Sequence, residues 1–140
     1  MNIQERQRLT SDWFLLLRNK ICAEFEKIES EFDAKNPGKF ARKTWKRPDQ
    51  SGDGGGGEIS LMKGNVFEKV GVNFSKVYGE FSEEFRKQIP GGVENGGKFW
   101  ASGISIVAHM KSPLVPAVHM NTRFICTEKS WFGGGADLTP

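Results

Sequence analysis

Apolar residues recur at steps of three and four between residues 11 and 35, which predicts one long amphipathic helix. The repeating positions are Phe14, Leu17, Ile21, Phe25, Ile28 and Phe32. Residues 10–12 offer polar side chains that suit an N-cap, and Asn36-Pro37-Gly38 is expected to stop the helix. Charged residues between the apolar positions, Glu29 among them, are expected on the solvated faces. We interpret this helix as a scaffold element.

Beyond residue 40 the pattern changes to the period of two that is typical of β-strands. Strands are expected over 40–47, over 59–78 with a turn at Gly64-Asn65, over 99–109 and over 117–124. Ser82 is expected to cap a short helix over 83–87. One helix followed by strands with short connections predicts an α+β fold, in which helices flank an antiparallel β-sheet.

The glycine-rich segment 51–58, SGDGGGGE, is expected to form a loop. A glycine run has no preferred conformation of its own, so a mobile linker and a loop that closes over a ligand are equally consistent with it. No GK[ST] sequence follows, which excludes a phosphate-binding P-loop on motif grounds.

The segment AVHMNTRF, residues 117–124, places a polar side chain at every second position of an otherwise apolar stretch. In a strand, alternate residues share a face, so His119, Asn121 and Arg123 lie together. The segment 99–109 places Ser105 and His109 on one face in the same way. A hairpin centred on Leu114 would set His109 opposite His119 and Ser105 opposite Arg123.

This polar face has two interpretations. It is either a solvated sheet surface or the wall of a site for an anionic ligand, because guanidinium binds carboxylates through two parallel hydrogen bonds and imidazole exchanges protons near neutral pH. Two histidines could bind a divalent metal, but the other ligands would have to be Asp, Glu or water. The C-terminal WFGGGADLTP adds Asp137, which is either the acceptor for ligand N–H groups or part of a plain turn.

Composition narrows the class of protein. The 140 residues are enough for one domain with a real core, and the net charge of +3 is too small for a nucleic-acid partner but suits a small anion. The start of the chain lacks an apolar targeting segment, and no stretch of the sequence is expected to span a membrane. Cys22 and Cys126 are isolated, which predicts free thiols in a reducing, cytoplasmic setting.

Three segments together resemble the oxygen-dependent coproporphyrinogen III oxidases. They are GGGGEISLMKGNVFEKVGVNFSKVYG, FWASGISIVAHMKSPLVPAVHMNTRF and WFGGGADLTP, in that order. The resemblance runs from about Trp45 to Pro140, and EKVGVN, HMNTRF and GGGADLTP are specific to the family.

The resemblance implies an enzyme that oxidatively decarboxylates two propionates of coproporphyrinogen III to vinyls with O2, which gives protoporphyrinogen IX in haem biosynthesis. It implies a homodimer that uses no organic cofactor. It carries over a substrate-contacting role to Ser105 and a substrate-binding run to Asn121, Thr122 and Arg123. It also implies metal-ligand roles for His109 and His119, proton donation by His119, and contact between Asp137 and the pyrrole N–H groups.

Family members are about twice as long as this chain, so the resemblance predicts that residues 1–140 form the N-terminal half of a single domain with an incomplete sheet. Catalysis by these residues alone is then not expected. The alternative is a non-catalytic remnant that binds a porphyrin or another anion.

Overall fold

The computed structural model describes residues 1–49, 52–94 and 96–140. Helix α1 spans Ile3–Phe32 and is therefore one helix that begins earlier than predicted. Its N-cap is Asn2, whose side chain accepts a hydrogen bond from the backbone N–H of Glu5 at 2.8 Å. The predicted cap at residues 10–12 is wrong, because the hydroxyls of Thr10 and Ser11 bond back to helix carbonyls instead.

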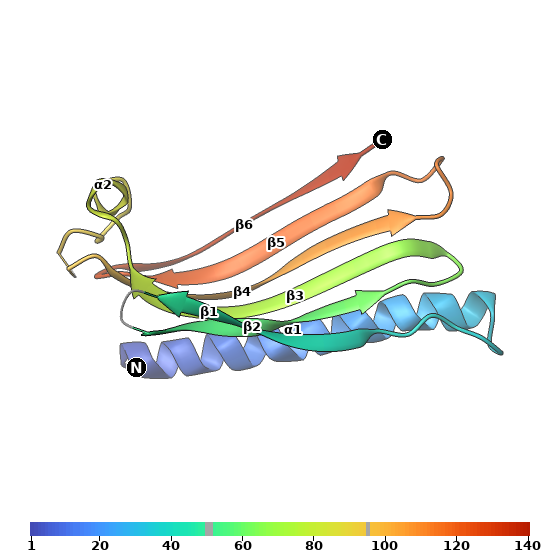
Figure 1. The fold of residues 1–140 in the computed structure, drawn as a ribbon, viewed down its shortest axis with the longest axis horizontal. Coiled ribbons are helices and arrows are strands. Elements are labelled where there is room, and N and C mark those ends of the chain that lie inside the picture. Colours follow the sequence, from blue (N-terminus) through green and yellow to red (C-terminus); the bar gives the residue numbers. More distant parts are fainter. Residues whose placement is uncertain (50–51, 95) are drawn as a thin grey trace.

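Six strands form one antiparallel sheet in the order of the sequence (Figure 1). They are β1 (Ala41–Asp49), β2 (Gly52–Met62), β3 (Phe67–Glu80), β4 (Lys98–Met110), β5 (Ala117–Cys126) and β6 (Ser130–Thr139). The short helix α2 (Glu83–Arg86) connects β3 to β4, and Ser82 caps it as predicted. The α+β class is therefore confirmed.

The glycine-rich segment forms most of strand β2 and is not a loop, except for Ser51, which lies outside the described residues. Gly56 is paired with Lys46 on one side and with Lys76 on the other. Glycine has a low intrinsic strand preference, but hydrogen bonding to a neighbour on each side holds the backbone extended. Long-range pairing therefore overrides the local preference that predicted a loop.

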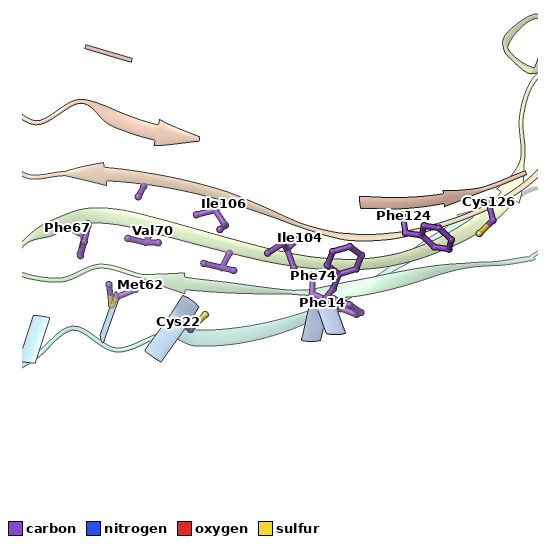
Figure 2. Packing of buried hydrophobic residues seen from close by; sticks show 12 residues of the cluster. Phe14, Cys22, Met62, Phe67, Val70, Phe74, Ile104, Ile106, Phe124 and Cys126 are labelled. Atoms are coloured by element: carbon purple, nitrogen blue, oxygen red, sulfur yellow. The ribbon is translucent and has the colours of Figure 1, made fainter. Parts of the chain in front are cut away.

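Helix α1 lies across one face of the sheet and packs on β3 and β4 (Figure 1). We call this the covered face; β3 and β4 contribute to it Val70, Val72, Phe74, Ile104, Ile106 and Ala108, all buried. Phe14 and Cys22 of α1 are buried against these side chains (Figure 2). Both cysteines are free and buried. No helix in the described part of the chain combines the length and apolar character needed to cross a bilayer.

The buried side of α1 differs from the predicted stripe. Ser11, Phe14, Arg18, Cys22 and Glu29 are buried, whereas Ile28 and Phe32 at the end of the predicted stripe are exposed. The helix is rotated because two of its charged side chains find partners on the sheet side. Arg18 donates to the carboxylate of Glu58 at 2.8 Å.

Glu29 connects the helix to the turn between β2 and β3, so its predicted place on a solvated face is wrong. Its carboxylate accepts hydrogen bonds from the backbone N–H groups of Asn65, Val66 and Phe67 at 2.7–2.9 Å. Burial by itself raises the pKa of the Glu29 carboxyl, but these backbone hydrogen bonds outweigh it, and the pKa lies below its ordinary value. Glu29 is therefore a buried anion held by backbone donors.

The β4–β5 hairpin has a different register from the predicted one. His119 is opposite Val107, and Arg123 is opposite Gly103, so the hairpin is centred on Pro113 and not on Leu114. In this turn the side chain of Ser112 accepts a hydrogen bond from the backbone N–H of Leu114. The predicted pairing was wrong by two residues, which preserves every side chain's face because the strand period is two.

Candidate functional site

A row of polar side chains crosses the face of the sheet that points away from α1, which we call the open face. Asn73 of β3 is the Cα partner of Ser105 on β4, and Ser105 is the partner of Asn121 on β5. Directly opposed residues of antiparallel strands point to the same side. The structure therefore brings Ser105, Asn121 and Arg123 onto one face, as the alternation of the sequence predicted.

His119 and Asp137 form a second polar pair on the open face. They are Cα partners on β5 and β6, and the His119 Nδ1 atom lies 3.4 Å from an Asp137 carboxylate oxygen. This is a long contact between partly exposed side chains. In the tautomer with a proton on Nδ1, His119 donates to Asp137, and its Nε2 atom is then free for proton exchange with a ligand. The sequence alone did not predict this pair.

Arg123 also has a defined orientation. Its guanidinium donates to the side-chain oxygen of Asn121 at 3.2 Å, so the Asn121 amide presents its N–H groups to other partners. Thr122, by contrast, is opposite Ile104 and lies on the covered side of the strand by alternation. Its side chain is thus separated from those of Asn121 and Arg123.

His109 shares the open face but is the Cα partner of Lys69 and is not opposite His119. In the described part of the chain no three His, Cys, Asp or Glu side chains are grouped so that they could hold a metal ion. Protein metal sites usually supply at least three ligands. The described residues therefore supply two imidazoles on one face of the sheet but no complete set of metal ligands.

Glycines surround the polar residues on the open face. Gly133 and Gly135 of β6 are opposite Arg123 and Asn121, and a Cβ atom at either glycine would meet no atom within 4 Å. The space above this part of the sheet is therefore open. A flat ligand could approach the backbone closely here, since no side chain intervenes. Residues 131–139 of WFGGGADLTP lie in strand β6 and do not form a turn.

A small cavity of about 120 Å³, which we call the donor hollow, lies along the polar row. It is lined by Asn73, Ser75, Gly103, Ile104, Ser105, Asn121, Thr122 and Arg123. No acidic residue is among them, and neither histidine is. Hydroxyl, amide and guanidinium N–H donors predominate, so the hollow suits a carboxylate rather than a cation.

Sequence reasoning missed two residues that join this site. Asn73 and Ser75 alternate with the buried Val72 and Phe74 on β3, and this alternation in VNFS was the available signal. Trp45 of β1 donates from Nε1 to the side-chain oxygen of Asn73 at 2.9 Å. The contact between Trp45 and Asn73 depends on the register of β1, β2 and β3, which the sequence does not display.

Comparisons with known proteins place the chain in a family. The family model for coproporphyrinogen III oxidase matches residues 10–140. An oxygen-dependent coproporphyrinogen-III oxidase of Rickettsia bellii is 61% identical over 143 residues, which cover 100% of this chain and 49% of that protein. The Rickettsia akari protein of the same name is 60% identical over 139 residues, which cover 97% of this chain and 48% of its own length.

The chain thus spans about half the length of the curated relatives it matches. The family match nonetheless covers the whole sheet and most of α1, including every residue of the open-face site. This chain belongs to the coproporphyrinogen III oxidase family.

Proposed function

We propose that the protein oxidatively decarboxylates propionate side chains of coproporphyrinogen III to vinyl groups with O2, which gives protoporphyrinogen IX in haem biosynthesis. The relatives at about 60% identity carry the name of this oxygen-dependent activity. The observation that carries the proposal is the open face itself. It combines Gly133 and Gly135 of β6, which we call the glycine floor, with the donor hollow, which no acidic residue lines, and with the His119–Asp137 pair beside them on β5 and β6.

The substrate class fits these features. A tetrapyrrole is wide and flat enough to lie over Gly133 and Gly135, where the space above the backbone is open. Its propionates are anions, and Arg123 offers a planar pair of donors that matches a carboxylate. Ser105 and Asn121 line the same hollow and would complete the contact. We extend the binding run to Thr122 through its backbone, since its side chain lies on the other side of the strand.

Asp137 and His119 supply the polar groups for the macrocycle. A carboxylate has two oxygens, so Asp137 can accept from His119 through one and from pyrrole N–H groups through the other. His119 would then exchange a proton at Nε2. Each propionate that becomes a vinyl group loses CO2, one proton and two electrons, and O2 accepts the electrons. In this scheme the protein binds, orients and moves a proton, and no step passes through a metal.

We also propose, on the family resemblance, that the full protein is a homodimer and works in the cytoplasm. Light scattering coupled to size-exclusion chromatography tests the first point, and localisation of a tagged protein tests the second. A monomer over the micromolar range would overturn the dimer without affecting the assignment of the open face.

Ligand binding tests the proposal in this chain directly. Coproporphyrin III, the stable oxidised form of the substrate, should quench tryptophan fluorescence on binding, and an uncharged planar aromatic should not compete. Incubation with coproporphyrinogen III in air, followed by chromatography, measures vinyl products. Binding without vinyl product is the result expected of residues 1–140 alone, and the same assay on a full-length protein then separates the enzyme from a porphyrin-binding protein without turnover. Absence of binding would overturn both.

Two substitutions test the roles of the charged residues. Arg123→Lys keeps the charge but loses the paired donors, so we expect a ten- to hundred-fold loss that falls mainly on particular propionates, with accumulation of a three-carboxylate intermediate in an active preparation. Asp137→Asn should instead weaken binding of the whole macrocycle and slow both decarboxylations. Arg8→Lys, on the exposed surface of α1, is the matched control.

Near-normal binding and turnover in both variants would mean that the open face is not the active site. Chromatographic separation of substrate, intermediate and product distinguishes the two expected patterns.

A further inference from the structure

Trp45 reaches Asn73 across an intervening strand. The two residues belong to β1 and β3, and the indole Nε1 donates to the Asn73 side-chain oxygen at 2.9 Å. Between them lies Gly57 of β2, which is the Cα partner of Trp45. A Cβ atom at Gly57 would clash with the backbone oxygen of Phe74 and would lie 2.7 Å from the indole ring, so both the β3 backbone and the ring require a glycine here.

This contact fixes the orientation of the Asn73 amide. An indole N–H can only donate, so the amide must turn its oxygen towards Trp45. The two N–H groups of the amide nitrogen then have no hydrogen-bond partner among the described residues. Asn73 is half-buried and lines the donor hollow, so these N–H groups are available to a ligand there.

The amide nitrogen complements the other groups of the hollow. Asn121 is oriented by Arg123 in the same sense, with its oxygen engaged and its nitrogen available. Asn73, Asn121 and Arg123 therefore all present N–H donors to a cavity that no acidic residue lines. A donor set of this kind favours a carboxylate, since each contact to a charged acceptor is stronger than one to a neutral acceptor.

We propose that Asn73 is a further substrate-binding residue, which donates to a propionate carboxylate, and that Trp45 is its positioning residue. This inference rests on the proposed function and deepens it. It adds a substrate contact on β3, through Asn73, to those on β4, β5 and β6. It also adds a positioning residue on β1, which is Trp45. It also gives Gly57 a second role besides its close approach to the Phe74 backbone, which is to leave space for the indole ring over β2.

Asn73→Asp provides the most direct test. The aspartate keeps the size and the acceptor for Trp45, but it removes two donors and places a negative charge in the hollow. We expect the affinity for coproporphyrin III, which has four carboxylates, to fall at least tenfold. The affinity for mesoporphyrin, which has two carboxylates, should fall less. Asn36→Asp makes the same chemical change at an exposed position far from the hollow and should leave both affinities unchanged.

Trp45→Phe tests the positioning role. Phenylalanine keeps a ring over Gly57 but cannot donate, so the affinity for coproporphyrin III should fall several-fold with little change in melting temperature. The same substitution in an Asn73→Ala background should have no further effect on affinity, because there is then no amide to orient. A structural role for Trp45 would instead weaken binding equally in both backgrounds and would overturn the positioning role.

The outcomes separate this inference from the function on which it rests. Wild-type chain that does not bind coproporphyrin III overturns both. If the wild-type chain binds coproporphyrin III and the Asn73→Asp variant binds each of the two porphyrins as tightly as the wild type does, only the role of Asn73 is overturned.

Discussion

The covered and open faces are formed by the same strands, yet residues that are adjacent in the sequence differ in burial and polarity between the two faces. On β3, Val72 is fully buried against α1, while Asn73 points to the other side and joins the polar row. On β4, Ile106 is buried and the adjacent Val107 is exposed. On β3 and β4 the centre of the covered face is a buried apolar cluster, whereas the polar row on the open face consists of amides, hydroxyls and a guanidinium.

Within each strand, residues on the covered face therefore stabilise the fold, while residues on the open face are available for ligand binding. Burying a valine or isoleucine side chain contributes roughly 1.5–3 kcal/mol, so the covered face holds the sheet and the helix together. Residues on the open face contribute little to that packing. Their identity can therefore be set by ligand chemistry without weakening the fold, and substitutions on the two faces should differ in their effects on stability and binding.

The largest expected effect comes from adjacent positions on β4. Ile106→Ala should lower the free energy of unfolding by about 3 kcal/mol, because it leaves a cavity in the buried cluster. Val107→Ala, at a position that is 40% exposed, should change it by less than about 0.5 kcal/mol. Urea unfolding measures both. Equal costs at the two positions would show that the open face is buried in solution and would refute the comparison.

A smaller effect is expected at Glu29, where the covered face contains a charge. Glu29→Gln keeps the shape but loses the anion that accepts three backbone N–H groups, so we expect a loss of about 2 kcal/mol at pH 7. The exposed Glu24→Gln is the control.

The stability of wild type and of Glu29→Gln should differ in its pH dependence, and the direction of the difference follows from the pKa of Glu29. The folded-state pKa of Glu29 lies below its ordinary value of 4.5. The Glu29 carboxylate therefore contributes fully to folding stability above pH 4.5, and this contribution is lost as the pH falls through the folded-state pKa. Wild-type stability should therefore fall more steeply below pH 4.5 than that of Glu29→Gln. Parallel pH curves for the two proteins would contradict the assignment of Glu29 as a buried anion.

The sequence predicted the faces of the strands better than their pairing. Alternation is a local property, so Ser105, Asn121 and Arg123 could be placed on one side before any partner was known. The hairpin register depends on the turn around Pro113, and the sequence offered no local signal that distinguished it from a turn around Leu114. The rotation of α1 depends on partners of Glu29 that are 36–38 residues away in the chain.

The same limit applies to the candidate site. The contact between His119 and Asp137 requires the β5–β6 register, and the contact between Trp45 and Asn73 requires two successive registers through Gly57. Glycine-rich segments are the hardest case. The segments that form β2 and β6 have little intrinsic strand preference, and only pairing with their neighbours makes them strands.

Two consecutive glycines of β6, Gly134 and Gly135, would carry a side chain on opposite faces of the sheet. A Cβ atom at Gly134 would lie 2.5 Å from the carbonyl oxygen of Asn121, whereas one at Gly135 would meet nothing within 4 Å. Gly134→Ala should therefore cost about 1–3 kcal/mol, because the backbone must shift. Gly135→Ala should leave stability within about 0.5 kcal/mol of wild type or raise it slightly, since it restricts the unfolded chain.

Ligand binding should reverse the order of these two variants. The methyl group of Gly135→Ala stands on the open face next to Asn121 and would hold a flat macrocycle away from the strand, so the affinity for coproporphyrin III should fall about tenfold, or about 1.4 kcal/mol. The methyl group of Gly134→Ala would point to the covered face. While this variant remains folded, its affinity for coproporphyrin III should be closer to that of wild type. Chemical unfolding and fluorescence titration on the same preparations measure both quantities. If Gly135→Ala bound coproporphyrin III with unchanged affinity, the glycine floor would not be the surface on which the macrocycle lies, although Arg123 and the donor hollow could still bind a propionate at its edge.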